Sequence, residues 1–120
     1  MAADRPPGLT THVLDLSRGQ PGAGMGYRLY RLAGEHRILL AQGRTNGDGR
    51  TDAPLLAGDT FKAGLYELEF DAAEYFRSLG EAAASIWTAI PIRFEITDAS
   101  SHYHVPLLIA PGGYSTYRGS

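Results

Sequence analysis

Four histidines give this sequence its clearest capacity for acid–base chemistry. An imidazole exchanges a proton near neutral pH, with a reference pKa of about 6.5. His102 and His104 are separated by one residue in an extended-type segment, so we expect their side chains to leave the same face of a strand. His12 lies in another predicted strand and is a candidate catalytic residue. His36 follows a polar turn, and we interpret it as a solvated surface residue.

Other polar residues with chemical potential lie far from the histidines in sequence. Arg50 follows a dense turn signal, N-G-D-G at residues 46–49, and Tyr117, Arg118 and Ser120 crowd the C-terminus. Taken singly, an arginine after a turn is a surface charge, and a terminal tyrosine is a packed aromatic residue. A β-sandwich could bring these segments to one place, but periodicity alone does not show that it does.

The sequence gives little support to metal, thiol, serine-nucleophile or phosphate-binding motifs. The H-x-H pair offers two ring nitrogens on one face, but a catalytic zinc site needs a third protein ligand, and no H-E-x-x-H segment supplies one. The lack of cysteine excludes disulfides, thiol catalysis and thiolate metal sites. The sequence has no G-x-S-x-G nucleophile elbow and no P-loop. We therefore expect no metal and no cofactor.

Short alternating segments between glycine- and proline-rich turns must position these residues. In the stretch 65–70, a leucine and two glutamates alternate with large apolar residues, a period of two that is typical of a half-buried strand. Strands are predicted at residues 9–16, 27–32, 38–42, 55–56, 61–70, 90–96, 103–109 and 114–117. Short strands at this spacing favour an all-β sandwich.

One short helix interrupts the strand pattern. Asp71 is a candidate N-cap, and Glu74 three residues later completes the signature of a capping box. Apolar residues follow at helical spacing, and Gly80 stands where the helix would end. The alanine-rich stretch 81–85 leaves open whether the helix continues.

The composition fits one domain with an ordinary core. The chain has 120 residues, of which 43% are hydrophobic, and a formal net charge of -2. This charge gives no indication of nucleic-acid binding, and no segment reaches the roughly 20 apolar residues that span a bilayer. The N-terminus lacks the apolar core of a secretory signal. We expect a cytoplasmic protein with a flexible arm at residues 1–8 and a single domain at residues 9–120.

Four segments, in order along the chain, resemble the motifs of 5-hydroxyisourate hydrolases. The segment L-T-T-H-V-L-D at residues 9–15 is similar to the opening motif of that family. T-N-G-D-G-R at residues 45–50 resembles its second motif, and H-Y-H-V-P-L-L at residues 102–108 its third. Y-S-T-Y-R-G-S at residues 114–120 resembles its closing motif, whose terminal tetrapeptide separates these enzymes from transthyretin.

The resemblance implies a fold, an assembly and a set of site residues. The implied fold is the transthyretin-like β-sandwich of two four-stranded sheets with one short helix. The implied assembly is a homotetramer, a dimer of dimers, with the active sites at the dimer–dimer interface. Carried onto this sequence, the catalytic residues are His12, Arg50, His104 and Ser120, and the substrate-binding residues are His12, Arg50, Tyr117 and Arg118.

The reaction that the resemblance implies is the hydrolysis of 5-hydroxyisourate to 2-oxo-4-hydroxy-4-carboxy-5-ureidoimidazoline, in urate and purine catabolism. Water would attack a cyclic amide carbonyl of this small-molecule substrate. His12 or His104 would take the proton from water, and Arg50 would stabilise the developing charge. Tyr117 and Ser120 would orient the substrate by hydrogen bonding.

Two other functions compete with this one. The first is a transthyretin-like carrier of small aromatic ligands, and the second is a sandwich without activity. Tyr117 argues against a carrier because transthyretin has a small threonine at the matching place, which leaves an open channel. His12 also favours chemistry, since transthyretin carries a lysine in that region.

Overall fold

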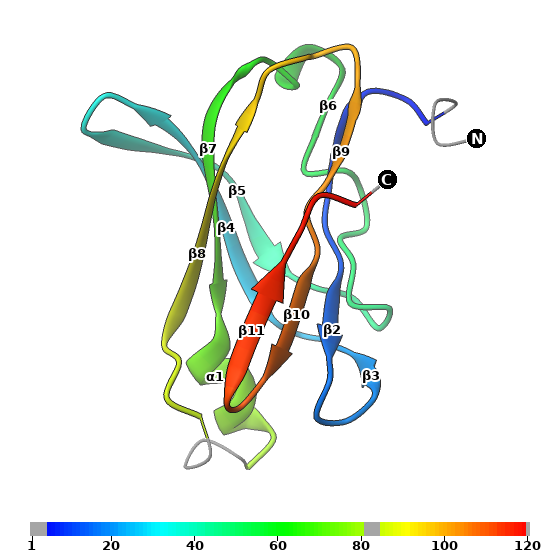
Figure 1. Ribbon diagram of the computed structural model, residues 1–120, viewed down its shortest axis with the longest axis vertical. Helices are drawn as coiled ribbons and strands as arrows, with labels where there is room; N and C mark the ends of the chain where they lie inside the picture. The colour runs from blue at the N-terminus through cyan, green and yellow to red at the C-terminus, as the bar shows by residue number, and fades with distance from the viewer. Residues whose placement is uncertain (1–4, 81–84, 120) are drawn as a thin grey trace.

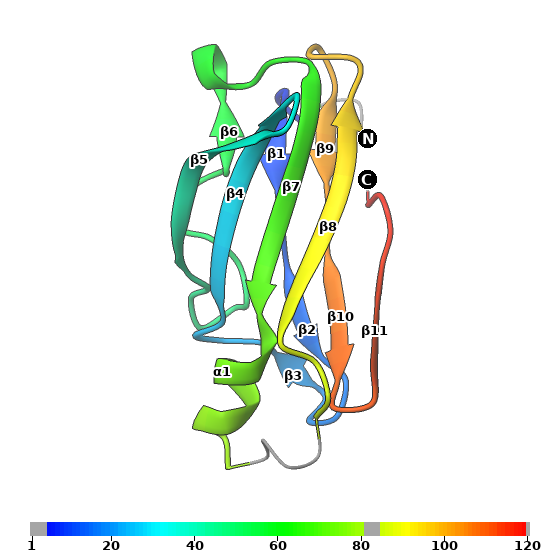
Figure 2. The ribbon, with the colours of Figure 1, turned by 90° about the vertical axis from the view of Figure 1, so that its left-hand side faces the viewer.

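Two layers of β-strands pack face to face in the computed structural model, which describes residues 5–80 and 85–119 (Figure 1). The first layer is one antiparallel four-stranded sheet in the order β5-β4-β7-β8. Its strands are β4 (Gly26–Ala33), β5 (His36–Arg44), β7 (Gly64–Asp71) and β8 (Ala89–Ile96). Turned by 90°, the molecule shows this sheet in front of the second layer (Figure 2).

The second layer has two sections, in the orders β6-β1-β9 and β11-β10-β2-β3. The first section contains β1 (Gly8–Thr10), β6 (Leu56–Ala57) and β9 (His102–His104). The second contains β2 (Val13–Asp15), β3 (Gln20–Pro21), β10 (Leu107–Ala110) and β11 (Gly113–Thr116). Within this layer, β1 runs parallel to β9, and β2 runs parallel to β10. The predicted all-β sandwich with one short helix is confirmed.

Two strands predicted as continuous are each divided in two. The strand predicted at residues 9–16 consists of β1 and β2, and the one predicted at 103–109 consists of β9 and β10. Pro106 lies in the second gap, where it cannot donate a ladder hydrogen bond. Across the gaps the segments stay joined, because Val105 N–H donates to Thr10 O at 2.9 Å and Leu107 N–H donates to His12 O at 2.9 Å.

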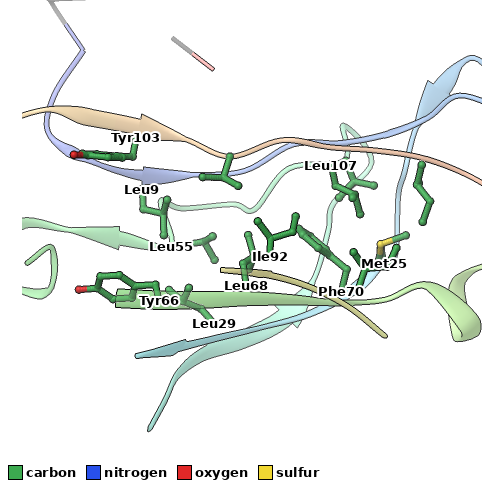
Figure 3. Packing of buried hydrophobic residues seen from close by; sticks show 14 of the residues in the cluster. Leu9, Met25, Leu29, Leu55, Tyr66, Leu68, Phe70, Ile92, Tyr103 and Leu107 are labelled. Atoms are coloured by element: carbon green, nitrogen blue, oxygen red, sulfur yellow. The ribbon is translucent and has the colours of Figure 1, made fainter. Parts of the chain in front are cut away.

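The apolar faces of the two layers meet in one core. Tyr66, Leu68 and Phe70 of β7 point toward Leu9, Tyr103 and Leu107 of the second layer (Figure 3). The alternation of residue types that predicted β7 is explained by this packing, because alternate residues of a strand lie on opposite faces and only one face meets the core. Burying large side chains of this kind stabilises the fold by about 1.5–3 kcal/mol each.

The helix α1 (Ala72–Ser78) joins β7 to β8 at one end of the sandwich (Figure 2). The Asp71 carboxylate accepts a hydrogen bond from Glu74 N–H at 3.1 Å, so the predicted N-cap is confirmed. The Glu74 carboxylate instead bonds the Arg44 guanidinium of β5, which ties the helix to the sheet. Gly80 has a φ of 77° and follows the last turn as predicted. The stretch 81–84, for which the sequence left a continuation of the helix open, lies outside the described residues.

Three short features differ from the sequence-based expectation. β3 lies inside a segment that we predicted as a loop, and the 3-10 turn η2 (Gly58–Thr60) was not predicted. Gly8, assigned to the flexible arm, is the first residue of β1. Its pairing with Ala57 and His102 places it within a ladder. Within the part of the chain that is described, no helix is long and apolar enough to cross a membrane.

Candidate functional site

The candidate histidines lie on the outer face of the second layer. Leu9, Thr11 and Val13 are buried between the layers, so Thr10 and His12, which alternate with them, face outward and are half-buried. In β9, the buried Tyr103 points inward, and the half-buried His102 and His104 on either side of it face outward. The expectation that His102 and His104 leave the same face is confirmed.

The second motif lies directly against the first. His12 and Arg50 form an antiparallel backbone bridge, and Val13 N–H donates to Gly49 O at 2.7 Å. The turn before Arg50 is closed by Asn46, whose side-chain oxygen accepts from Asp48 N–H at 2.9 Å and from Arg50 N–H at 3.1 Å. This Asx-type turn fixes the backbone that carries the guanidinium beside His12.

Gly49 allows this close approach. Its φ is 75°, in the left-handed region, and a Cβ atom added there would lie 2.4 Å from Val13 O. A side chain would therefore both strain the backbone and push the loop away from β2. The dense turn signal in the sequence thus has a specific structural role, which is to hold Arg50 next to His12.

The C-terminal segment lies against His104 of β9. Gly119 N–H donates to His104 O at 2.7 Å, and the two residues form an isolated antiparallel bridge. A Cβ atom on Gly119 would lie 2.6 Å from Cδ2 of the imidazole. Glycine is therefore required for the terminal backbone to rest against this ring.

Thr10 connects the two histidines of β9. Its hydroxyl lies 2.8 Å from Nδ1 of His104 and 3.1 Å from Nε2 of His102. The second nitrogen of His102, Nδ1, lies 3.1 Å from the Pro6 carbonyl oxygen. We had not selected Thr10 from the sequence, although its spacing of two from His12 predicts a shared face.

Burial and positive charge keep two imidazoles of this face neutral. Burial lowers the pKa of His104 to about 4, with the Arg50 guanidinium as the second cause. The pKa of His12 is also lowered, first by burial and then by Arg50, against a smaller opposing effect of Asp48. Both rings therefore carry a free lone pair at neutral pH.

The terminal residues lie partly elsewhere. The Arg118 guanidinium stacks over the Tyr103 ring at 4.0 Å from its centroid and donates to His102 O at 3.1 Å. Because the Tyr103 side chain leaves β9 on the face opposite the imidazoles of His102 and His104, the Arg118 guanidinium that stacks on it does not join these imidazoles within one chain. Tyr117 is exposed and, with Arg118, lines a cavity of about 310 Å³ beside β8. Ser120 lies outside the described residues.

The metal alternative can also be compared with the geometry. Residues 5–80 and 85–119 contain no group of three histidine, cysteine, aspartate or glutamate side chains that could hold a metal ion. His102 and His104, which the H-x-H pattern offered as two ligands, both form hydrogen bonds with the Thr10 hydroxyl. Imidazole and guanidinium groups of this kind can transfer protons and stabilise anions.

Comparisons with known proteins agree with the motifs. The model of the HIUase/Transthyretin family matches residues 9–119. The protein named 5-hydroxyisourate hydrolase 2 of Rhizobium meliloti (strain 1021) is 54% identical over 114 residues, which are 93% of this chain and 95% of the relative.

Two solved structures share the fold. The 5-hydroxyisourate hydrolase of Klebsiella pneumoniae is 39% identical with a TM-score of 0.80, covering 93% of this chain and 97% of its own. Transthyretin from Sparus aurata is 25% identical with a TM-score of 0.85, covering 96% of this chain and 97% of its own. A family match over nearly the whole chain, with relatives of this similarity, leads to one conclusion: the protein belongs to the HIUase/Transthyretin family.

Proposed function

We propose that this hydrolase opens the six-membered ring of 5-hydroxyisourate, giving 2-oxo-4-hydroxy-4-carboxy-5-ureidoimidazoline in purine catabolism. The observation that carries the proposal is the meeting of three sequence segments on one face. His12, Arg50 and His104 lie close enough for the guanidinium to lower the pKa of both imidazoles. Relatives of similar length, such as the Rhizobium meliloti protein, are named for this activity.

A neutral imidazole supplies the base for the reaction. His104 or His12 accepts a proton from water, whose oxygen then bonds to a cyclic amide carbonyl carbon. The ring C–N bond breaks as the tetrahedral intermediate collapses, and the ring nitrogen takes a proton. Because both histidines have a lowered pKa, they present an unprotonated nitrogen at the pH of the cell. Positioning the water and the carbonyl contributes further, since well-oriented groups can lower a barrier by about 7–11 kcal/mol.

Arg50 provides the complementary electrostatic part. Its guanidinium offers several N–H donors to an oxygen-rich planar substrate and to the oxyanion that forms on the attacked carbonyl. Its exposed position beside His12 leaves it accessible from the outer face. The family resemblance further implies that the substrate is oriented by three C-terminal residues, Tyr117, Arg118 and Ser120.

The position of the site supports an oligomeric form. His12 and His104 lie half-buried on the outer face of a layer, so a second chain placed on this face would enclose the substrate. We propose the homotetramer, a dimer of dimers, that the family resemblance implies. Light scattering at micromolar concentration tests the tetramer by measuring the molar mass in solution. A monomer under those conditions would contradict the proposed assembly.

The activity is tested on substrate generated freshly from urate, because 5-hydroxyisourate decays by itself. The parent protein should accelerate the decay, and His104→Ala and His12→Ala should each lower kcat, by up to about 10²–10⁴-fold for whichever residue is the base. His36→Ala, an exposed position on β5, serves as the matched control and should keep the parent rate. Parent-level rates in both His104→Ala and His12→Ala would overturn the assignment.

A further inference from the structure

Three hydrogen bonds link an N-terminal carbonyl to the imidazole of His104. They join Pro6 O to His102 Nδ1 at 3.1 Å, His102 Nε2 to Thr10 Oγ1 at 3.1 Å, and Thr10 Oγ1 to His104 Nδ1 at 2.8 Å. The parallel register of β1 and β9, in which Thr10 pairs with His104, places the hydroxyl between the two rings. Pro6 and His104, the two ends of this series of hydrogen bonds, are 98 residues apart in the sequence.

The chain of bonds has a fixed direction because its first member can only accept. The Pro6 carbonyl has no proton, so Nδ1 of His102 must carry the hydrogen. In a neutral His102 ring, Nε2 is then an acceptor, and it must receive the single proton of the Thr10 hydroxyl. The Thr10 oxygen is left as an acceptor toward His104.

The consequence falls on His104. Its Nδ1 must donate to the Thr10 oxygen, so in the neutral ring the remaining lone pair lies on Nε2. The opposite arrangement, in which Thr10 donates to His104, would force Nε2 of His102 to donate as well. His102 would then carry two protons and a positive charge, next to the other cationic and imidazole groups of this face.

We propose that Thr10 and His102 are positioning residues that fix neutral His104 in the Nδ1–H tautomer and leave Nε2 as the proton acceptor. This inference deepens the proposed function, because it names the nitrogen that would take the proton from water. When Nε2 becomes protonated, the Nδ1–H bond to Thr10 remains in place, so the same contact supports the ring before and after proton transfer. Neither positioning residue needs to touch the substrate.

The tautomer of His104 can be measured directly by two-bond ¹H–¹⁵N correlation spectra of the full-length protein at neutral pH. The parent protein should show His104 protonated on Nδ1. Thr10→Val, which removes only the hydroxyl, should abolish this fixed preference, and Thr10→Ser should restore it. Thr60→Val is the matched control, because its hydroxyl bonds only within the η2 turn and should leave His104 unchanged.

A second variant tests the direction of the relay. His102→Phe removes the acceptor of the Thr10 proton, so the hydroxyl becomes free to donate to His104 and the Nε2–H tautomer should gain population. If Thr10→Val does not fold, His102→Phe decides the question alone. His104 protonated mainly on Nε2 in the parent, or an unchanged Nδ1–H preference in every folded variant, would overturn the proposal.

Kinetics separate positioning from a purely structural role. Thr10→Val should lower kcat on the order of 10–100-fold with little change in KM, as for other hydrogen-bond partners that orient a functional histidine, and Thr10→Ser should recover most of it. The proposed function and the proposed tautomer of His104 can be refuted by different experiments. An inactive parent protein would refute the proposed function, whereas the spectra decide the tautomer without any substrate.

Discussion

The outer faces of the two layers differ in how their charged groups are paired. On the β5-β4-β7-β8 sheet, the Glu67 carboxylate is only 3% exposed and accepts from Arg93 Nε at 2.8 Å and from Arg37 Nη1 at 2.9 Å. On the other layer, Arg50 lies near His12 and His104, two groups that are themselves basic.

The pKa values record the difference. Burial alone would raise the pKa of Glu67, but the hydrogen bonds from Arg93 and Arg37 lower it overall, so the carboxylate stays ionised within a compensated network. For His104, burial and the surrounding positive groups act together, and the ring stays neutral. On the first face the charged groups pair with one another, whereas on the second face two imidazoles remain unprotonated, as the proposed function requires.

Among the variants that compare the two outer faces, Arg50→Met should have the largest effect. Removing the guanidinium should lower kcat/KM by about 10²–10³-fold, the usual loss when one oxyanion donor is removed. It should also raise the pKa of His12 and His104, because the positive charge lowers both in the parent. The measurement is the fresh-substrate assay, with NMR titration of the two rings.

Arg37→Met is the matched control for that comparison. It removes a guanidinium from the other outer face, where Arg37 pairs with Glu67 and Glu69. Activity and histidine titration should stay at parent values. Equal loss of activity in both arginine variants would show that the two faces do not differ in function.

Gly49→Ala should destabilise the fold by about 2–5 kcal/mol. The left-handed φ costs roughly 1–2 kcal/mol for a non-glycine residue, and the overlap with Val13 O adds about 1–3 kcal/mol. Gly47→Ala in the same turn is the control, since a Cβ atom there would meet nothing within 4 Å. Urea unfolding measures both, and equal midpoints would contradict the role given to Gly49.

Glu67→Gln should have the smallest effect, about 1–2 kcal/mol of stability, because the two arginines that it pairs with are themselves substantially exposed. Because the folded-state pKa of Glu67 is lowered, its contribution is fully present above the unfolded-state pKa of 4.5 and is lost progressively as the pH falls from there through the folded-state pKa. Chemical unfolding at pH 7 and pH 4 measures this. The exposed Glu95→Gln is the control, and a similar loss there would contradict the assignment.

Local patterns predicted most of the fold. The alternation in β7 and the N-cap at Asp71 act over a few residues, and both predictions are confirmed. The division of β1 from β2 could not be predicted in this way, because it depends on which distant strands each half pairs with. The tie between Glu74 and Arg44 likewise joins segments 30 residues apart.

The candidate site was predictable only in part. Family motifs named His12, Arg50 and His104, and the structure explains their proximity through a backbone bridge and a glycine turn. The link through Thr10 depends on the parallel register of β1 and β9, which no single segment of sequence encodes. Arg118, named by the same motifs, stacks on Tyr103 within one chain, and its proposed role in substrate binding stays a prediction.

The measurement that tests this account most directly is an NMR pH titration of the His104 and His12 rings in the full-length protein. We expect both rings to titrate below the ordinary histidine value of 6.5, with His104 at about pH 4. A His104 ring that becomes protonated at or above pH 6.5 would contradict the claim that this face holds neutral imidazoles ready to accept a proton.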